Sequence, residues 1–339
     1  MKKYTFAIVG ALGNVGREVQ KILEISDLPI KNLLLMDLEQ NVGKKVLWRD
    51  EEYTVIESNS EAFLDVDLAI MSAGEKASLK LTPKAVDFGC VIIDNSTAFR
   101  MALEHPLVVP EVNAHKLENH RGIIANPNCS TIQMLVALNP IHKKYKIKRV
   151  VVSTYQAVSG SGRAGIEELN DQNHAFAIGK KPVSSVYPHP IAFNIIPHID
   201  DFLENGYTKE EMKMILETTK ILDSNIQITA TTVRVPVVTS HSESLNIETK
   251  KTFNINDIKE MMATSPGIEL EDDPYENVYP LALSAKGKDA VFVGRIRRDF
   301  SMKNALNMWC VSDNLRKGAA LNAVQIAQEL VNRNLIRVP

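Results

Sequence analysis

Hydrophobic residues in the first 128 positions gather in short apolar runs, separated by longer segments of helical periodicity. The apolar runs are predicted strands at 4–10, 30–37, 53–58 (weaker), 66–74 and 90–96. Two intervening segments, 13–26 and 76–89, have helical spacing, and in the first of them Val15, Val19, Ile22 and Leu23 share a face. Continuous apolar strands that alternate with helices predict a parallel, doubly wound, Rossmann-like sheet.

The pattern changes after Cys129. Long strand-like runs are predicted at 148–162, 227–249 and 289–299, and a helix at 208–222 opens with the capping box Thr208 and Glu211. A helix that begins near Cys129 is expected to present an apolar stripe. Strands segregated from helices predict a second α+β domain with a mixed sheet. An Ala-rich helix at 316–334 is expected to return to the first domain. The predicted domains are therefore 1–128 with 313–339, and 129–312.

Composition narrows the class of protein. A chain of 339 residues is long enough for two domains, and 45% apolar and 24% charged residues are typical of a soluble globular protein. A formal net charge of -2 gives no basis for nucleic-acid binding. The sequence predicts no membrane span and no signal peptide. Three cysteines without metal-ligand spacing predict neither a disulfide framework nor a metal site, which favours a cytoplasmic location.

Three glycines, Gly10, Gly13 and Gly16, follow the first predicted strand and open the first predicted helix. Glycines there let a pyrophosphate approach the backbone, and the helix N-terminus offers N–H groups and a positive dipole end. We favour dinucleotide binding over an ordinary strand–helix turn. Asp37 ends the second strand, where a carboxylate binds a ribose 2′-hydroxyl and repels a 2′-phosphate. It favours NAD over NADP, unless it is merely a solvated acid at a strand end.

Cys129 lies where a reactive thiol is expected. Pro127 keeps Asn126 out of the helical region, so a helix begins near Cys129, and a helix N-terminus favours a thiolate. The alternative is a buried inert cysteine, which suits Cys90 and Cys310 better because both lie in apolar runs.

Eight histidines are candidates for the base that a nucleophilic thiol requires. His241 directly follows a strand among hydroxyl residues, whereas His189 and His198 lie in a Pro-rich loop. The residues alone do not choose among them.

Two arginines and one helical pair complete the candidates. Arg100 and Arg234 are candidates for binding a phosphate or a carboxylate. The alternative is that each forms a surface ion pair that contributes little to stability. Glu217 and Lys220 are three residues apart on a helix, where such pairs usually only stabilise the helix.

Together these residues lie in motifs that resemble one family over nearly the whole chain. The sequence resembles the aspartate-β-semialdehyde dehydrogenases. The motifs, in family order, are GALGNVG (10–16), MSAGEKAS (71–78), IIDNSTAFR (92–100), VVPEVN (108–113), ANPNCSTIQ (125–133), VVSTYQAVSGSGR (151–163), LETTKI (216–221), TTVRVPVVTSHSES (231–244) and DNLRKGAA (313–320).

The resemblance implies reductive dephosphorylation of L-aspartyl-β-phosphate to L-aspartate-β-semialdehyde and phosphate with NADPH, in lysine, methionine and threonine biosynthesis. It implies that Cys129 forms a thioester, His241 is the general acid/base and Gln156 orients the substrate. The implied substrate contacts are Arg234 to the α-carboxylate, Glu217 to the α-amino group, and Arg100, Asn128 and Lys220 to the phosphate. The implied cofactor-binding residues are Gly10, Leu12, Gly13, Asn14, Val15, Gly16, Asp37, Ser72, Ala73, Gly74, Ser159, Gly160 and Asn314.

The chain departs from the family after the second strand. Family members commonly have a Ser/Arg-rich turn there for the 2′-phosphate, whereas this sequence has Asp37 and Glu39. We expect NADP as the family cofactor with weakened discrimination against NAD, unless Lys44 or Lys45 compensates. The family also implies a homodimer or a dimer of dimers, formed through the sheet of the second domain.

Three other functions remain as alternatives. Another acyl-phosphate reductase, such as the N-acetylglutamyl-phosphate or glyceraldehyde-3-phosphate enzymes, would use the same thiol chemistry. The NPNCSTIQ context and the Glu217/Arg234 pair argue against it. A non-catalytic dinucleotide-binding sensor would not need Cys129, Gln156 and His241. A purely structural two-domain protein would leave the arginines without a role.

Overall fold

The computed structural model describes residues 2–338, and the chain divides into two compact units. The first unit runs to Asn128 and resumes at Ala319, and the second runs from Cys129 to Gly318. The return of the chain brings helix α9 (Leu321–Asn332) into the first unit.

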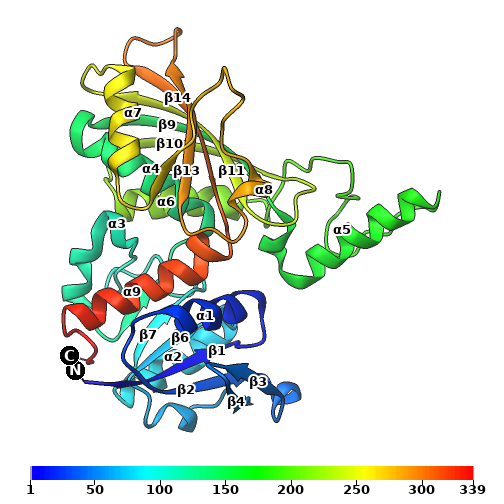
Figure 1. The fold of residues 1–339 in the computed structure, drawn as a ribbon, viewed down its shortest axis with the longest axis vertical. Coiled ribbons are helices and arrows are strands. Elements are labelled where there is room, and N and C mark those ends of the chain that lie inside the picture. Colours follow the sequence, from blue (N-terminus) through cyan, green and yellow to red (C-terminus); the bar gives the residue numbers. More distant parts are fainter. Residues whose placement is uncertain (1, 339) are drawn as a thin grey trace. The chain divides into compact units, whose positions relative to one another are not determined.

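A six-stranded parallel sheet forms the centre of the first unit (Figure 1). In the order β5-β2-β1-β6-β7-β8, its strands are Ile56–Glu57, Ile30–Asp37, Tyr4–Val9, Leu68–Met71, Val91–Asp94 and Ile123–Ala125. All five neighbouring pairs are parallel, which confirms the predicted doubly wound sheet. The weaker predicted strand is divided between β5 and β4 (Glu51–Thr54). β4 forms a separate antiparallel pair with β3 (Lys45–Trp48).

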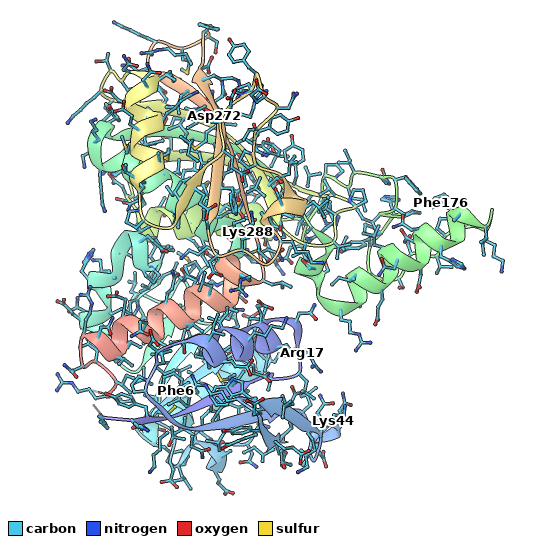
Figure 2. The ribbon with its side chains drawn as sticks, in the orientation of Figure 1. Phe6, Arg17, Lys44, Phe176, Asp272 and Lys288 are labelled. Atoms are coloured by element: carbon cyan, nitrogen blue, oxygen red, sulfur yellow. The ribbon has the colours of Figure 1, made fainter. Side chains whose placement is uncertain are left out.

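Buried clusters cover both faces of this sheet, which is why its strands are continuously apolar. Phe6 (Figure 2) and Ile8 point into the cluster shared with helices α1 (Asn14–Ile25) and α9. Alternate residues such as Val9 point into the other cluster, shared with α2 (Glu75–Asp87). The remaining short elements are α3 (Pro110–Asn113), η1 (Glu39–Asn41), η2 (Glu61–Phe63) and η3 (Ala114–Asn119).

A second six-stranded sheet, in the order β10-β9-β11-β14-β13-β12, forms the centre of the second unit. Its strands are Gln227–Arg234, Ile147–Gln156, His241–Thr249, Ala305–Ser312, Val291–Arg298 and Ile268–Leu270. β10–β9 and β12–β13 are parallel pairs, and the other three pairs are antiparallel. The sheet is therefore mixed, as predicted.

Helices α4 (Cys129–Tyr145), α6 (Lys209–Ile221) and α7 (Ile255–Thr264) pack against this sheet. The predicted capping box starts α6: Glu211 N–H donates to the Thr208 hydroxyl, and the Glu211 carboxylate accepts from Thr208 N–H. Ile132, Leu135 and Val136, the apolar stripe expected for α4, are buried, but burial is not confined to one face, because every residue from 130 to 139 is buried. Small and polar residues are buried here because α4 is enclosed by the sheet and by other helices of its unit.

Helix α5 (Gly162–Ala177) extends away from the sheet of the second unit, with Phe176 toward its outer end (Figures 1 and 2). The buried carboxylate of Glu168 holds the returning chain beside this helix, because it accepts bonds from the N–H groups of Ser185, Val186 and Tyr187. The unit also contains η4 (Val158–Ser161), α8 (Ala282–Ala285) and a π-helical turn at Arg316–Ala320.

Candidate active site

The glycine loop of the first unit is closely packed where β1 meets β6. Gly10 has φ +80°, and a Cβ added there would lie 2.6 Å from the Ser72 carbonyl oxygen and 3.1 Å from Ala73 N. A Cβ on Gly16 would collide with the Gly10 carbonyl oxygen. The loop therefore requires glycine at both positions, and it brings the GALGNVG and MSAGEKAS motifs together.

The N-terminus of α1 fits an anionic group. Its cap, Gly13, provides no side-chain hydrogen bond, and the first turn contains no acidic residue. Asn14 Nδ2 is buried and has no partner among the described residues. Leu12 and Val15 are half-buried beside it. Uncapped N–H groups and an unpartnered amide suit a pyrophosphate at this position.

Asp37 serves a structural purpose that the sequence did not suggest. It is 6% exposed, and its Oδ2 accepts from Leu12 N–H at 2.8 Å. Its Oδ1 accepts from Leu38 N–H at 2.8 Å and from Asn41 Nδ2 at 2.7 Å. The carboxylate therefore ties the glycine loop to the end of β2 and is not a solvated acid. Its expected contact with a ribose remains a prediction.

Arg100 is buried in the first unit at the end of the loop that follows β7. Its Nε donates to the Asn126 carbonyl oxygen at 3.0 Å, and its Nη2 donates to the Asn95 carbonyl oxygen at 3.1 Å. It is not the weak surface arginine of the alternative interpretation. Asn128, also buried, is the last residue before α4.

Cys129 is the first residue of α4 and is half-buried, whereas Cys90 and Cys310 are fully buried. This confirms the distinction drawn from their sequence contexts. Gly318 lies against it, because a Cβ at that position would be 2.9 Å from Cys129 Cβ. Sequence reasoning missed Gly318, although a glycine within DNLRKGAA was a visible signal.

Gln133, one turn after Cys129, connects α4 to the sheet of the second unit. Its Nε2 donates to the His241 carbonyl oxygen at 3.3 Å, and its Oε1 accepts from the Ser312 hydroxyl at 3.0 Å. A fully buried glutamine in an apolar helix was the signal that sequence reasoning overlooked.

His241 begins β11 and is completely buried. Its Nδ1 accepts from Ala157 N–H at 3.0 Å, and its Nε2 has no partner among the described residues. Burial, and next the nearby Arg234 cation, hold the pKa of His241 well below its usual range. His241 is thus buried near Arg234, whereas His189 is exposed and His198 is half-buried, a difference that the residue pattern without the family resemblance did not show.

A strained residue positions His241. Ser240 has φ +77°, a left-handed conformation unusual for a non-glycine residue. Its N–H donates to Asn314 Oδ1 at 2.9 Å, and the Asn314 amide also bonds the Ser159 hydroxyl at 3.0 Å. Asn314 thereby joins the η4 loop to the turn before His241.

The side chain of Gln156 is fixed from two directions. Its Nε2 donates to Glu210 Oε1 at 3.1 Å and to the Thr154 hydroxyl at 3.3 Å. Its amide oxygen is therefore the acceptor end that remains for another group. Glu210, buried in the first turn of α6, was not identified from the sequence.

Arg234 is a buried cation without an acidic partner. It is 5% exposed, its Nη1 donates to the Ala157 carbonyl oxygen at 2.7 Å, and its Nε is unpartnered. Within residues 2–338 no carboxylate forms an ion pair with it. Gly160 makes room for it, because a Cβ there would lie 2.9 Å from Nη1. An uncompensated buried guanidinium is costly unless an anion binds.

Glu217 and Lys220 lie one turn apart on α6 of the same unit. Glu217 is 1% exposed, whereas Lys220 is half-buried. A carboxylate so deeply buried is unlike a surface helix pair, which argues against the purely stabilising interpretation.

Among residues 2–338, no group of three or more His, Cys, Asp or Glu side chains could hold a metal ion. No helix within residues 2–338 is long and apolar enough to cross a membrane.

Two family models match the chain, one within each unit. The semialdehyde dehydrogenase NAD-binding domain matches residues 5–120, and the semialdehyde dehydrogenase dimerisation domain matches residues 138–317. Aspartate-semialdehyde dehydrogenase of Aquifex aeolicus is 51% identical and covers 98% of this chain and 99% of its own. The Bacillus subtilis enzyme is 48% identical, and the match covers 97% of this chain and 98% of that enzyme.

A solved structure has the same fold. The crystal structure of aspartate semialdehyde dehydrogenase II from Vibrio cholerae, complexed with ASA, superposes with a TM-score of 0.96 at 43% identity. The superposition covers 98% of this chain and 99% of the Vibrio cholerae chain. The chain therefore belongs to the aspartate-semialdehyde dehydrogenase family of NAD(P)-dependent oxidoreductases.

Proposed function

We propose that this enzyme converts L-aspartyl-β-phosphate to L-aspartate-β-semialdehyde and phosphate, through a thioester on Cys129. The observation that carries the proposal is Arg234, a buried guanidinium with no acidic partner in the described part of the chain. A substrate α-carboxylate would neutralise it in bidentate geometry. The buried Glu217 carboxylate would bind the α-ammonium group, so that one cation and one anion match an amino acid.

The thiol chemistry follows from the position of Cys129. At the first position of α4 the helix dipole favours the thiolate, which attacks the acyl carbon as phosphate leaves. Arg100, Asn128 and Lys220 are the groups we assign to the phosphate. Gln156, held by Glu210, offers its amide oxygen to orient the substrate, and His241 is the acid–base group.

The pyrophosphate assignments rest on the first unit. Gly10, Gly13 and Gly16, with the first turn of α1, would hold the pyrophosphate, beside Ser72, Ala73 and Gly74. The bound nicotinamide supplies the hydride that reduces the thioester. We assign Ser159, Gly160 and Asn314 to the nicotinamide side of the reaction, and NADPH as the cofactor, with NADH accepted because Asp37 and Glu39 follow β2.

We also propose a homodimer formed through the sheet of the second unit. α4, α6 and α7 belong to one face of this sheet, while side chains of β9, β11 and β14 that point the other way stay half-exposed. Tyr155 and Trp309 are aromatic residues of this face, and their ring centroids are 5.5 Å apart. Aromatic residues are enriched at protein interfaces. Cytoplasmic amino-acid biosynthesis remains part of the proposal.

The reverse reaction tests the function. L-Aspartate-β-semialdehyde, phosphate and either NADP or NAD are mixed with the protein, and reduced cofactor is followed by absorbance. We expect phosphate-dependent turnover that Cys129→Ala abolishes and that Cys90→Ala, a matched control on a buried cysteine, leaves intact. Folded protein with no turnover on this aldehyde, but turnover on N-acetylglutamate semialdehyde, would reject the substrate. No turnover on either would favour a sensor.

A further inference from the structure

Asn126 is a buried polar residue that directly follows β8 and precedes Cys129 by three positions. Its backbone is bonded in both directions. The N–H donates to the Asp94 carbonyl oxygen at 2.7 Å, and the carbonyl oxygen accepts from Arg100 Nε at 3.0 Å. The main chain of Asn126 thus connects the end of β7 to the buried arginine, within the first unit.

The side chain of Asn126 is also bonded at both ends of its amide. Its Nδ2 donates to Asn95 Oδ1 at 2.7 Å and to the Ala319 carbonyl oxygen at 3.2 Å. Its Oδ1 accepts from Asn322 Nδ2 at 2.7 Å. A carboxamide has two N–H donors, and both are used here. Asn126 therefore has no side-chain donor left for an anion, and it can serve an anion site only by holding other residues.

Two backbone carbonyl oxygens fix the guanidinium of Arg100. One belongs to Asn126 and accepts from Nε, and the other belongs to Asn95 and accepts from Nη2 at 3.1 Å. The side chains of these same two residues are joined by the 2.7 Å hydrogen bond. Because a guanidinium is a planar fork with fixed N–H directions, the spacing of the two carbonyl groups determines its plane. The hydrogen bond between Asn95 and Asn126 keeps this spacing constant.

The chain that returns through α9 fixes the orientation of the Asn126 amide. Ala319 is the residue at which the chain re-enters the first unit, and its carbonyl group can only accept, so it requires Nδ2 on its side. Asn322, on α9, is fully buried and is itself held by the Val108 carbonyl oxygen at 3.0 Å. Nδ2 therefore stays directed at Asn95, and with it the two carbonyl groups stay directed at Arg100.

We infer that Asn126 is a positioning residue for the phosphate-binding arginine: its amide, through Asn95, sets the direction in which Arg100 presents its N–H groups, and Asn126 itself does not contact the phosphate. The inference rests on the proposed function, which assigns Arg100 to the phosphate. Charge-assisted hydrogen bonds from a guanidinium to an oxyanion depend on the direction of the donors. Loss of the amide should therefore weaken phosphate binding and leave binding of the aldehyde nearly unchanged.

Steady-state kinetics of the reverse reaction separate this role from a purely stabilising one. Phosphate is varied at saturating L-aspartate-β-semialdehyde and NADP. Asn126→Ala removes three side-chain hydrogen bonds, whereas Asn95→Ala removes the one bond that joins the two residues, at a half-buried position. We expect kcat/KM for phosphate to fall about 10–100-fold in Asn126→Ala and about 3–10-fold in Asn95→Ala, while KM for the aldehyde stays within about twofold of the wild type. If Asn126→Ala does not fold, Asn95→Ala decides.

Asn113→Ala is the matched control. Asn113 is a buried asparagine of the same unit, and its amide accepts from Val109 N–H at 3.0 Å and donates to the Leu107 carbonyl oxygen at 2.9 Å. We expect this variant to lose stability, measured as Tm, and to keep the wild-type kcat/KM for phosphate. An equal fall of kcat/KM in the control, or an unchanged value in Asn95→Ala, would overturn the inference.

A double-mutant cycle tests whether the effect passes through Arg100. In an Arg100→Ala background, Asn95→Ala should change kcat/KM for phosphate by less than about twofold, since the group that it orients is already absent. The full effect in both backgrounds, or a wild-type kcat/KM in Arg100→Ala alone, would overturn the inference.

Absence of phosphate-dependent turnover in the wild type would reject the proposed function instead. The phosphate site is then measured without turnover, as the rise in Tm that phosphate causes relative to chloride at equal ionic strength. We expect a smaller rise in Asn95→Ala than in the wild type, and equal rises would overturn the inference.

Discussion

Replacing Asp37 with alanine separates a structural role for this carboxylate from a role in cofactor choice. The buried side chain accepts three hydrogen bonds, from Leu12 N–H, Leu38 N–H and Asn41 Nδ2. Alanine accepts none, so the glycine loop loses its connection to the end of β2. If this connection is the main role of Asp37, the first consequence of the substitution is lost stability.

The size of the loss follows from the three donors. A donor left without a partner costs about 1–3 kcal/mol, and these sites are half-buried, so water partly compensates. We therefore expect about 1 kcal/mol for each donor and about 3 kcal/mol for Asp37→Ala. For a unit of this size the loss lowers Tm by roughly 6–12 °C. Asp37→Asn keeps one acceptor oxygen and should lose about half as much.

Thermal unfolding without cofactor measures the stability, and fluorescence titration with NADPH and NADH measures the affinities. Glu39→Gln is the matched control, because Glu39 is an exposed acid two residues away on η1 with no side-chain hydrogen bond among the described contacts. We expect this control to keep its Tm and to bind NADPH more tightly relative to NADH, since it removes a negative charge. Asp37→Asn loosens the glycine loop and should weaken both cofactors, but NADPH less than NADH, because it also removes a negative charge. An unchanged Tm in Asp37→Ala, with a selective gain in NADPH affinity, would refute this reasoning.

Three further changes test other parts of the structure. Gly160→Ala places a Cβ 2.9 Å from Arg234 Nη1, so the guanidinium must move; we expect kcat/KM for the semialdehyde to fall about 10–100-fold with the fold retained, and wild-type kinetics would contradict this. Burial raises the pKa of Glu243, so the folded state keeps its proton and stability falls as pH rises from the ordinary value of about 4.3 toward the raised pKa. Glu243→Gln should flatten that decline in urea unfolding measured at pH 5 and pH 8, and an unchanged slope would count against a buried neutral acid. Burial tends to raise the pKa of Glu168, but the N–H groups of Val186 and Ser185 and the Ser185 hydroxyl outweigh it and lower the pKa. The stability that the Glu168 carboxylate contributes is therefore present at neutral pH and lost as pH falls. Glu168→Gln should speed proteolysis of residues 178–200 at pH 7, and by less near pH 4. Equal cleavage of the variant and the wild type at pH 7 would show that this carboxylate does not hold the segment.

Much of the fold was predictable because its signals are local. Continuous apolar runs indicated the buried parallel strands, and glycine spacing after β1 indicated the loop that Gly10 and Gly16 form. The capping box of α6 lies within four residues, so sequence alone identified it. The burial of α4 on every side was not predictable for the opposite reason: contacts with the sheet and with other helices enclose it, and no spacing within the helix records them.

The features of the candidate site also separate into those that local sequence indicated and those that only tertiary packing set. The sequence by itself determined that Cys129 begins a helix, that Cys90 and Cys310 lie in buried apolar runs, and that the glycine loop opens α1, since each depends on neighbours in the chain. Only the tertiary structure places the His241 ring against the Ala157 N–H, across 84 residues of chain. It also decided that Asp37 clamps the glycine loop across 25 residues, and that Gln156 is held by Glu210 across 54. Hydrogen bonds between distant residues depend on how strands and helices pack, and local patterns of polarity do not specify that packing.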